Sequence, residues 1–334
     1  MIGFFIALVL IGFIFVFTYG EYSKVFNIRG KESTDFCDYF LARLPTLKAE
    51  PFTFLSGKET LAGMRFSYTV EPKALLVMVH GYGWNMEDYF PQAELFARQG
   101  YLVLIFDGMG IGRSSGASIH GLPQHMLDAA AMLDYVAADA TLAALPLLLY
   151  GHSWGGYAAD AVHCGKRYPV RAIVSVSAYN EPLAVMEKTL QDKYGWLSRI
   201  LIVPPVIFQR LAFGKAANYS AVRGLGQVDC PVLVVHSRGD TMLPFAGNYQ
   251  KIYDAHRDKS NFCFIPLEGE NHNIGIPHGV NERRIALQRE LRKAEEKEAL
   301  SAELWAVQMV IDEEMLGQFA AFFEESLQKG DAEV

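Results

Sequence analysis

Cysteine is scarce in this chain of 334 residues, and the spacing of its cysteines excludes two kinds of structure. The four residues lie far apart, without the paired spacing of a zinc site or the density of a disulfide scaffold. Two of them fall at or inside segments that we expect to be buried strands. We interpret all four as free thiols, and the sequence predicts no metal site. They are Cys37, Cys164, Cys230 and Cys263.

The chain also lacks an excess of positive charge. Its 30 Lys and Arg residues are outnumbered by 37 Asp and Glu residues, which gives a formal net charge of -7 at pH 7. Nucleic acids and broadly anionic surfaces attract basic proteins, so we expect neither as a partner. The charge does not select a substrate.

A third absence concerns dinucleotide cofactors. The glycine-rich segment Asp107–Gly116 follows an apolar run that we expect to be a strand, which is where such cofactors bind. The G-x-G-x-x-G pattern would need a glycine at position 113, and Arg113 stands there. We therefore expect no nicotinamide or flavin, and we expect the chain to need no other cofactor.

The chain does have a long apolar run at its start. Residues 2–19 carry no charge and are long enough to cross a bilayer core of about 30 Å as a helix. Signal peptides begin with positive charge, and no Lys or Arg precedes this run, so we interpret residues 1–24 as a retained membrane anchor. Lys24, Arg29 and Lys31 follow it and favour a cytoplasmic position for the remaining chain. Secretion after signal cleavage is the alternative.

The strongest motif is Gly-His-Ser-Trp-Gly at 151–155. It follows the apolar run Leu147–Tyr150 and precedes a helix-like stretch, and this strand–turn–helix context is the one that a nucleophile elbow needs. A serine on such a tight turn leaves no room for side chains on its neighbours, and glycine tolerates the required backbone angles. We therefore predict that Ser153 is a catalytic nucleophile.

An acid and a base follow the serine in the expected order. Asp240 comes directly after the predicted buried strand Pro231–Ser237, in an Arg-Gly-Asp turn. His272 comes shortly after the next predicted strand, Phe262–Pro266. We predict that His272 is the general base and that Asp240 orients it.

Five landmarks now stand in order along the chain, and together they resemble the α/β-hydrolase superfamily over roughly residues 50–280. The resemblance is narrower to the serine-aminopeptidase-like branch, which includes monoglyceride lipases and lysophospholipases. It implies a Ser–His–Asp hydrolase of esters or amides. It also implies an oxyanion hole made by the backbone N–H groups of Tyr82 and Trp154. The landmarks are H-G-Y-G at 80–83, D-G-M-G-I-G-R-S-S-G at 107–116, G-H-S-W-G at 151–155, S-R-G-D at 237–240 and E-N-H at 270–272.

The expected architecture is an α/β-hydrolase domain over residues 50–330, with a mostly parallel sheet flanked by helices and an N-terminal transmembrane helix. We expect a helical cap insertion at 179–229 and added C-terminal helices at 282–328. Within the latter, Glu282–Leu300 reads as one charged, solvated helix and Ala302–Gln328 as one amphipathic helix.

The cap is where we expect specificity to be determined. Met186, Trp196, Phe208 and Phe213 lie in it and are predicted to line a pocket for an acyl chain. The alternative is that each merely packs the cap onto the core.

Three functions remain open from the sequence. The favoured one is a membrane-tethered hydrolase of carboxylic esters such as acylglycerols or lysophospholipids. The second is an aminopeptidase or amidase with the same triad, in which Glu181 or Glu187 holds the free amine. The third is a catalytically silent binding protein on a hydrolase fold. The sequence does not indicate an oligomeric state.

Overall fold

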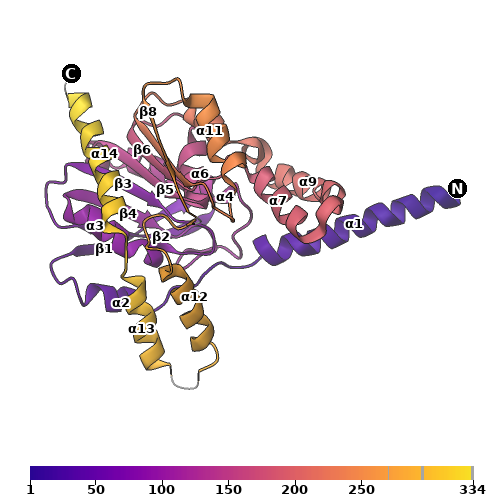
Figure 1. Cartoon of the computed structure of the whole chain (residues 1–334), viewed down its shortest axis with the longest axis horizontal. Helices are drawn as coiled ribbons and strands as arrows, with labels where there is room; N and C mark the ends of the chain where they lie inside the picture. The colour runs from indigo at the N-terminus through magenta and orange to yellow at the C-terminus, as the bar shows by residue number, and fades with distance from the viewer. Residues whose placement is uncertain (270, 295–296, 332–334) are drawn as a thin grey trace.

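The computed structural model describes residues 1–269, 271–294 and 297–331 (Figure 1). These residues form one eight-stranded sheet in the order β1-β2-β4-β3-β5-β6-β7-β8. The first two strands pair antiparallel, β2 pairs antiparallel with β4, and all other pairs are parallel. The strands are β1 Lys48–Ser56, β2 Glu59–Ser67, β3 Ala74–Val79, β4 Tyr101–Phe106, β5 Leu147–His152, β6 Val170–Val176, β7 Val232–Ser237 and β8 Phe262–Leu267.

The helices lie before, between and after these strands (Figure 1). Five of them are short 3-10 turns, labelled η. The helices are α1 Ile2–Phe26, α2 Phe36–Leu41, η1 Met86–Tyr89, α3 Phe90–Arg98, α4 Gln124–Ala138, α5 Ala140–Ala143, α6 Trp154–Ala161, η2 Val162–Cys164, α7 Pro182–Tyr194, η3 Gly195–Leu197, α8 Ser198–Leu201, α9 Val203–Phe213, η4 Gly214–Asn218, α10 Ala221–Leu225, η5 Phe245–Gly247, α11 Tyr249–His256, α12 Val280–Leu291, α13 Glu298–Gln308 and α14 Glu313–Asp331.

The central strands are buried on both faces, which explains their continuous apolar sequences. In β3, Leu75 and Val77 belong to the core cluster that also contains residues of α4, α6 and α10. Leu76 and Met78 belong to the opposite cluster, with residues of α2, α3 and α14. The predicted α/β-hydrolase fold, with a mostly parallel sheet covered by helices on both faces, is confirmed.

Helix α1 does not stand apart from the domain. Its first half is exposed, whereas its second half packs on the insertion between β6 and β7, which contains α7–α10 (Figure 1). The ring of Phe208 lies 6.1 Å from that of Phe15 and 5.4 Å from that of Tyr19. Glu21 pairs with Lys193 of α7. The apolar N-terminal segment is therefore also a packing partner of the cap.

Two helical segments have the composition of membrane spans. Among the described residues, α1 is the one single helix long and apolar enough to cross a membrane. The pair Pro182–Leu201 and Val203–Leu225 passes the same test only when taken together, and it is bent by 76°. The composition of α1 fits both a membrane anchor and a signal sequence.

The C-terminal region differs from the sequence prediction. Glu282–Leu300 was predicted to be one charged, solvated helix, but α12 ends at Leu291 and α13 begins at Glu298. The two helices pack against each other, and each buries a leucine, Leu287 or Leu304. Leu287 lies within the predicted helix, and a single solvated helix would leave it in water, so its burial favours the reversal of the chain. Residues 295–296 of the predicted helix lie outside the described part.

Ala302–Gln328 was likewise predicted to be one helix and is two. α13 ends at Gln308, and α14 begins at Glu313. The carboxylate of Asp312 accepts a hydrogen bond of 3.0 Å from the backbone N–H of Met315. A side-chain cap of this kind starts a new helix, which explains the division.

Candidate active site

The sharp turn between β5 and α6 holds Ser153 in a strained conformation. Its φ of 56° and ψ of -113° lie in a region that non-glycine residues rarely occupy. The flanking glycines permit the turn. A Cβ on Gly155 would lie 2.0 Å from the backbone oxygen of Val79, and one on Gly151 would lie 2.3 Å from that of Gly155. The G-x-S-x-G pattern is therefore required by close backbone packing.

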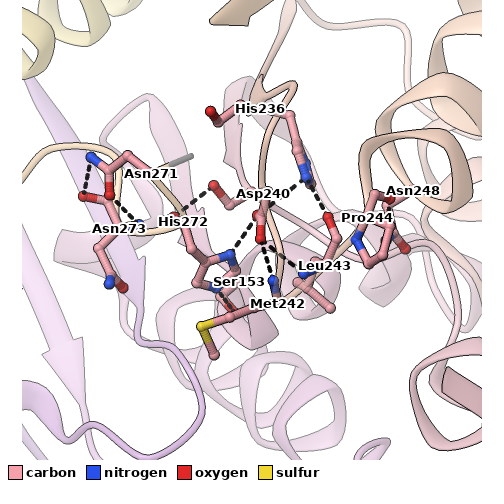
Figure 2. Close-up of polar contacts among 12 residues, drawn as sticks. Ser153, His236, Asp240, Met242, Leu243, Pro244, Asn248, Asn271, His272 and Asn273 are labelled. Atoms are coloured by element: carbon pink, nitrogen blue, oxygen red, sulfur yellow. Dashed lines mark hydrogen bonds and ion pairs between the residues drawn. The ribbon is translucent and has the colours of Figure 1, made fainter. Parts of the chain in front are cut away.

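The three predicted triad residues lie within hydrogen-bond distance of one another (Figure 2). The Nε2 atom of His272 is 2.9 Å from the Oγ atom of Ser153. On its other side, His272 Nδ1 is 2.6 Å from Oδ2 of Asp240. Ser153 follows β5, Asp240 follows β7 and His272 follows β8, so three ends of parallel strands bring them together. All three side chains are buried.

The carboxylate of Asp240 is held by several donors. The backbone N–H groups of Met242 and Leu243 donate to its Oδ1 at 2.9 Å each. Burial raises the pKa of Asp240, but hydrogen bonds from His236 and His272 outweigh burial and hold the pKa below its usual range. Asp240 is therefore an anion that accepts a hydrogen bond from the Nδ1–H group of His272. This tautomer directs the lone pair of Nε2 toward Ser153.

A second hydrogen-bond network supports the backbone of His272. The N–H of Gly81 donates to the Tyr89 hydroxyl at 2.8 Å, and that hydroxyl lies 2.7 Å from His152 Nδ1. His152 Nε2 lies 3.1 Å from the backbone oxygen of His272, to which Ser177 Oγ also donates at 2.8 Å. Burial lowers the pKa of His152 to about 3, so its imidazole is neutral, with one nitrogen accepting and the other donating.

The loop after β3 lies against the nucleophile turn. A Cβ placed on Gly81 would be 3.4 Å from the Cβ of Ser153. The backbone N–H of Tyr82, one of the two predicted oxyanion donors, has no acceptor within the described residues. The second predicted oxyanion donor is the backbone N–H of Trp154. Trp154 is the first residue of α6, and an N–H group at that position has no acceptor within its own helix. Both amides are therefore available to an external acceptor beside Ser153.

A cavity of about 580 Å³ adjoins Ser153 and His272. The residues that line it come from the loops after β3, β7 and β8, from the turn at Ser153, from the segment around Lys31 and from the C-terminal region that includes α12 and α13. Among them are Trp84, Met242, Arg284, Ile285, Leu304 and Trp305.

The four predicted pocket residues of the cap do not line this cavity. Met186 and Phe213 are buried in the core cluster. Phe208 packs on rings of α1, and the side chain of Trp196 is 74% exposed. The pocket prediction is therefore wrong for this cavity, because part of the apolar surface of the cap is covered by α1. The alternative, packing within the protein, describes Met186, Phe208 and Phe213.

The two acids proposed for amine binding also lie elsewhere. Neither Glu181 nor Glu187 lines the cavity, and Glu181 lies 3.5 Å from Lys251. Across residues 1–269, 271–294 and 297–331, no group of three or more His, Cys, Asp or Glu side chains is placed to hold a metal ion.

Two supporting residues were not identified from the sequence. His236 was interpreted only as a strand residue, yet its Nε2 lies 3.3 Å from Oδ2 of Asp240. Tyr89 was not singled out. Its position near the start of a helix carried no signal, whereas His236 stands one residue before the end of β7 and four before Asp240, a spacing that could have drawn attention to it.

Comparisons with known proteins show what the chain is similar to. The family model described as serine aminopeptidase, S33, matches residues 70–218. A monoacylglycerol lipase of Mycolicibacterium smegmatis is 27% identical over 229 residues, which is 56% of this chain and 79% of that protein. The lysophosphatidylserine lipase ABHD12 of Danio rerio is 25% identical over 193 residues, and the match covers 55% of this chain but only 48% of that protein.

Solved structures support the fold alone. An esterase of Pyrococcus furiosus superposes with a TM-score of 0.57 at 16% sequence identity. The match covers 80% of this chain and 97% of the esterase. The rest of this chain lies outside the match and has no counterpart in the superposed part of the esterase.

Proposed function

We propose that the chain, which has the α/β-hydrolase fold and is similar to the serine-aminopeptidase-like branch, is a serine hydrolase of lipid-like carboxylic esters. The observation that carries the proposal is the unbroken series of hydrogen bonds from Ser153 through His272 to Asp240. The names of the two relatives, both lipases, support an ester with an acyl chain.

In the first half of the proposed reaction, Ser153 Oγ attacks the acyl carbon while His272 Nε2 takes its proton. Asp240 stabilises the imidazolium that forms. The N–H groups of Tyr82 and Trp154 donate to the oxyanion. The tetrahedral intermediate then collapses, the C–O bond to the leaving alcohol breaks, and His272 returns the proton to that alcohol.

In the second half, a water molecule gives its proton to His272 and attacks the acyl-enzyme. The acid leaves, and Ser153 recovers its proton from the imidazolium. The backbone contacts of His272 with His152 and Ser177 keep the imidazole in place during both transfers. The chemistry needs no redox step.

The cavity favours the ester function over the amidase alternative. An aminopeptidase needs an acidic group free to bind the amine of its substrate. Among the described residues, the acid that lines the cavity is Asp88, and it is already paired with two cations, Lys31 and Arg284. The silent-protein alternative gives no reason for a strained serine aligned with a histidine.

We further propose that α1 is a retained anchor, with the hydrolase domain on the cytoplasmic side of the membrane. Cleavage near Gly20 would remove Phe15 and Tyr19, which pack on Phe208 of the cap. The loss of these contacts argues against secretion. An uncleaved N-terminus in intact-mass analysis, with retention in the membrane pellet after an alkaline wash, is the expected result. A mature chain that starts after residue 20 would refute the anchor.

The ester proposal is tested by measuring turnover on two substrate series, p-nitrophenyl esters of increasing acyl length and aminoacyl p-nitroanilides. We expect hydrolysis of the esters, a rate that depends on chain length, and little action on the amides. Ser153→Ala should reduce hydrolysis of both substrate series to a small residual rate. Faster hydrolysis of the amides would support the amidase alternative instead, and ester turnover retained in Ser153→Ala would refute the assignment.

A further inference from the structure

One wall of the cavity beside Ser153 carries more positive than negative charge. Lys31 Nζ lies 2.6 Å from Oδ1 of Asp88, and Arg284 pairs with the same oxygen. The side chain of Asp88 is fully buried. Burial raises the pKa of Asp88, but the two cations outweigh burial, so that the pKa lies below its usual range and the group is ionised. Two cations therefore share one carboxylate.

Arg284 has N–H donors that no acceptor among the described residues occupies. Its residue is only 4% exposed, and its guanidinium lies 4.8 Å from the centre of the Trp84 ring. A guanidinium carries five N–H donors, and among the described residues the hydrogen-bond acceptor of Arg284 is Asp88 alone. Burying a cation costs free energy when its one anionic partner is also paired with a second cation, unless another anion binds there. Its place in the cavity wall gives such an anion access.

A third cation lies directly after the end of the same helix. Arg292 follows Arg284 by eight residues in the sequence, and both line the cavity, as does Gln288 between them. The side chain of Arg292 is exposed, and it forms no ion pair with any described residue. Among the described residues that line the cavity, Lys31, Arg284 and Arg292 are thus three cations beside one acid, Asp88, in a chain whose overall charge is negative.

The acid that precedes Asp88 in the sequence, Glu87, does not cancel this excess. Glu87 is buried, but it does not line the cavity. Its carboxylate accepts hydrogen bonds from Thr34 and lies 3.3 Å from Arg113, so it is already paired with a cation of its own.

The cations share the cavity with several apolar side chains. Side chains of Met242, Ile285, Leu291, Leu304 and Trp305 line the same cavity as the cations. A site that joins basic and apolar walls suits a molecule with both an anionic and an apolar part.

We propose that this cavity binds the anionic head group, a phosphate or a carboxylate, of a single-chain acyl ester, through Arg284 and Arg292 with Lys31 beside them. The inference rests on the proposed function, because it names the substrate class of the same site. It differs from a general affinity for anionic surfaces, since the charge is confined to one cavity.

The test is calorimetric binding to the full chain carrying Ser153→Ala, which cannot turn the probes over. The probes are decyl phosphate, 1-O-decylglycerol and inorganic phosphate, each below its aggregation concentration. We expect decyl phosphate to bind about tenfold or more tightly than the neutral ether, since hydrogen bonds to charged groups give discrimination of this size. Its affinity should fall with added salt.

The variants Arg292→Gln and Arg289→Gln form a matched pair at the C-terminal end of α12, with Arg289 in its last turn and Arg292 directly after it. Both residues are exposed arginines, but only Arg292 lines the cavity. Arg292→Gln should remove much of the preference for decyl phosphate, and Arg289→Gln should leave it unchanged. Arg284→Gln should remove more of the preference for decyl phosphate, but it also breaks a buried ion pair and could impair folding. Arg292→Gln breaks no such pair, so its effect on binding can be measured independently of folding.

Several results would overturn the inference. They are equal affinity for decyl phosphate and the neutral ether, equal effects of the two matched variants, and binding of inorganic phosphate as tight as that of decyl phosphate. Failure of the proposed function has a different signature. In that case the parent protein would not hydrolyse p-nitrophenyl esters, whatever the binding preference of the Ser153→Ala protein.

Discussion

His236 Nε2 lies 3.3 Å from Oδ2 of Asp240, the same oxygen that His272 Nδ1 contacts at 2.6 Å (Figure 2). Asp240 thus has two imidazole neighbours. His236 also lies 2.9 Å from the backbone oxygen of Leu243, whose own N–H donates to Asp240. The second histidine therefore fixes the loop that carries the acid as well as the acid itself.

The first prediction concerns this histidine. His236→Leu should lower kcat by about tenfold with a smaller effect on KM, because Asp240 loses a charge-assisted contact and its loop loses an anchor. Steady-state kinetics on an ester measures the effect. His256→Leu removes another buried histidine, one that contacts the backbone oxygen of Val222 away from the triad, and should change stability without this fall in kcat. Equal kcat in the two variants would contradict the role of His236.

The second prediction concerns the link between the oxyanion loop and His272. Tyr89→Phe removes the hydroxyl that accepts from Gly81 N–H and contacts His152, so the loop and the histidine lose their common support. We expect kcat to fall by roughly tenfold. The matched control is Tyr150→Phe, which removes another buried hydroxyl, one that donates to Gln92. If both variants lose kcat alike, the link has no special role.

The third prediction is a pH dependence of stability. Burial lowers the pKa of His152 to about 3, so the folded protein keeps this residue neutral where the unfolded chain, with an ordinary histidine, binds a proton. The unfolded state therefore binds more protons, and stability is lost as pH falls from about 6.5 toward about 3.

The variant His152→Gln isolates this effect. At pH 7 the parent should be the more stable, because its imidazole makes two good hydrogen bonds. By pH 4 the parent should lose roughly 3 kcal/mol relative to the variant. Urea unfolding of both proteins at several pH values measures the difference. A difference that does not change with pH would show that His152 is not held neutral in the fold.

The fourth prediction tests the glycine at the nucleophile turn. Gly155→Ala should destabilise the fold by about 1–3 kcal/mol or more, since its Cβ would lie 2.0 Å from the backbone oxygen of Val79. Gly317→Ala, within α14, meets no atom within 4 Å and should be neutral or stabilising. Thermal unfolding compares the two. Equal melting temperatures for the two variants would mean that the turn can relax to accommodate the added methyl group.

Much of the triad was predictable because each residue follows a strand whose apolar sequence is visible. Parallel strands end at one edge of a sheet, so Ser153, Asp240 and His272 had to lie near one another once the strands were recognised. The sharp turn at Ser153 was predictable from its two glycines for the same local reason.

The cavity was not predictable, because it depends on contacts between distant segments. The apolar residues of the cap gave no sign that α1 would cover Phe208. The charged stretch after His272 looked solvated, although Arg284 in it is buried against Asp88, 196 residues earlier in the chain. Periodicity reports which face of a helix is apolar, and it does not report which element covers that face.

The account depends on one hydroxyl group, and site-resolved labelling tests it most directly. The full chain is treated with a fluorophosphonate probe and digested, and the modified residue is found by mass spectrometry. The account predicts a single adduct on Ser153, slower labelling in His272→Ala, and no adduct in Ser153→Ala. An adduct on another serine, or labelling that persists in Ser153→Ala, would contradict it.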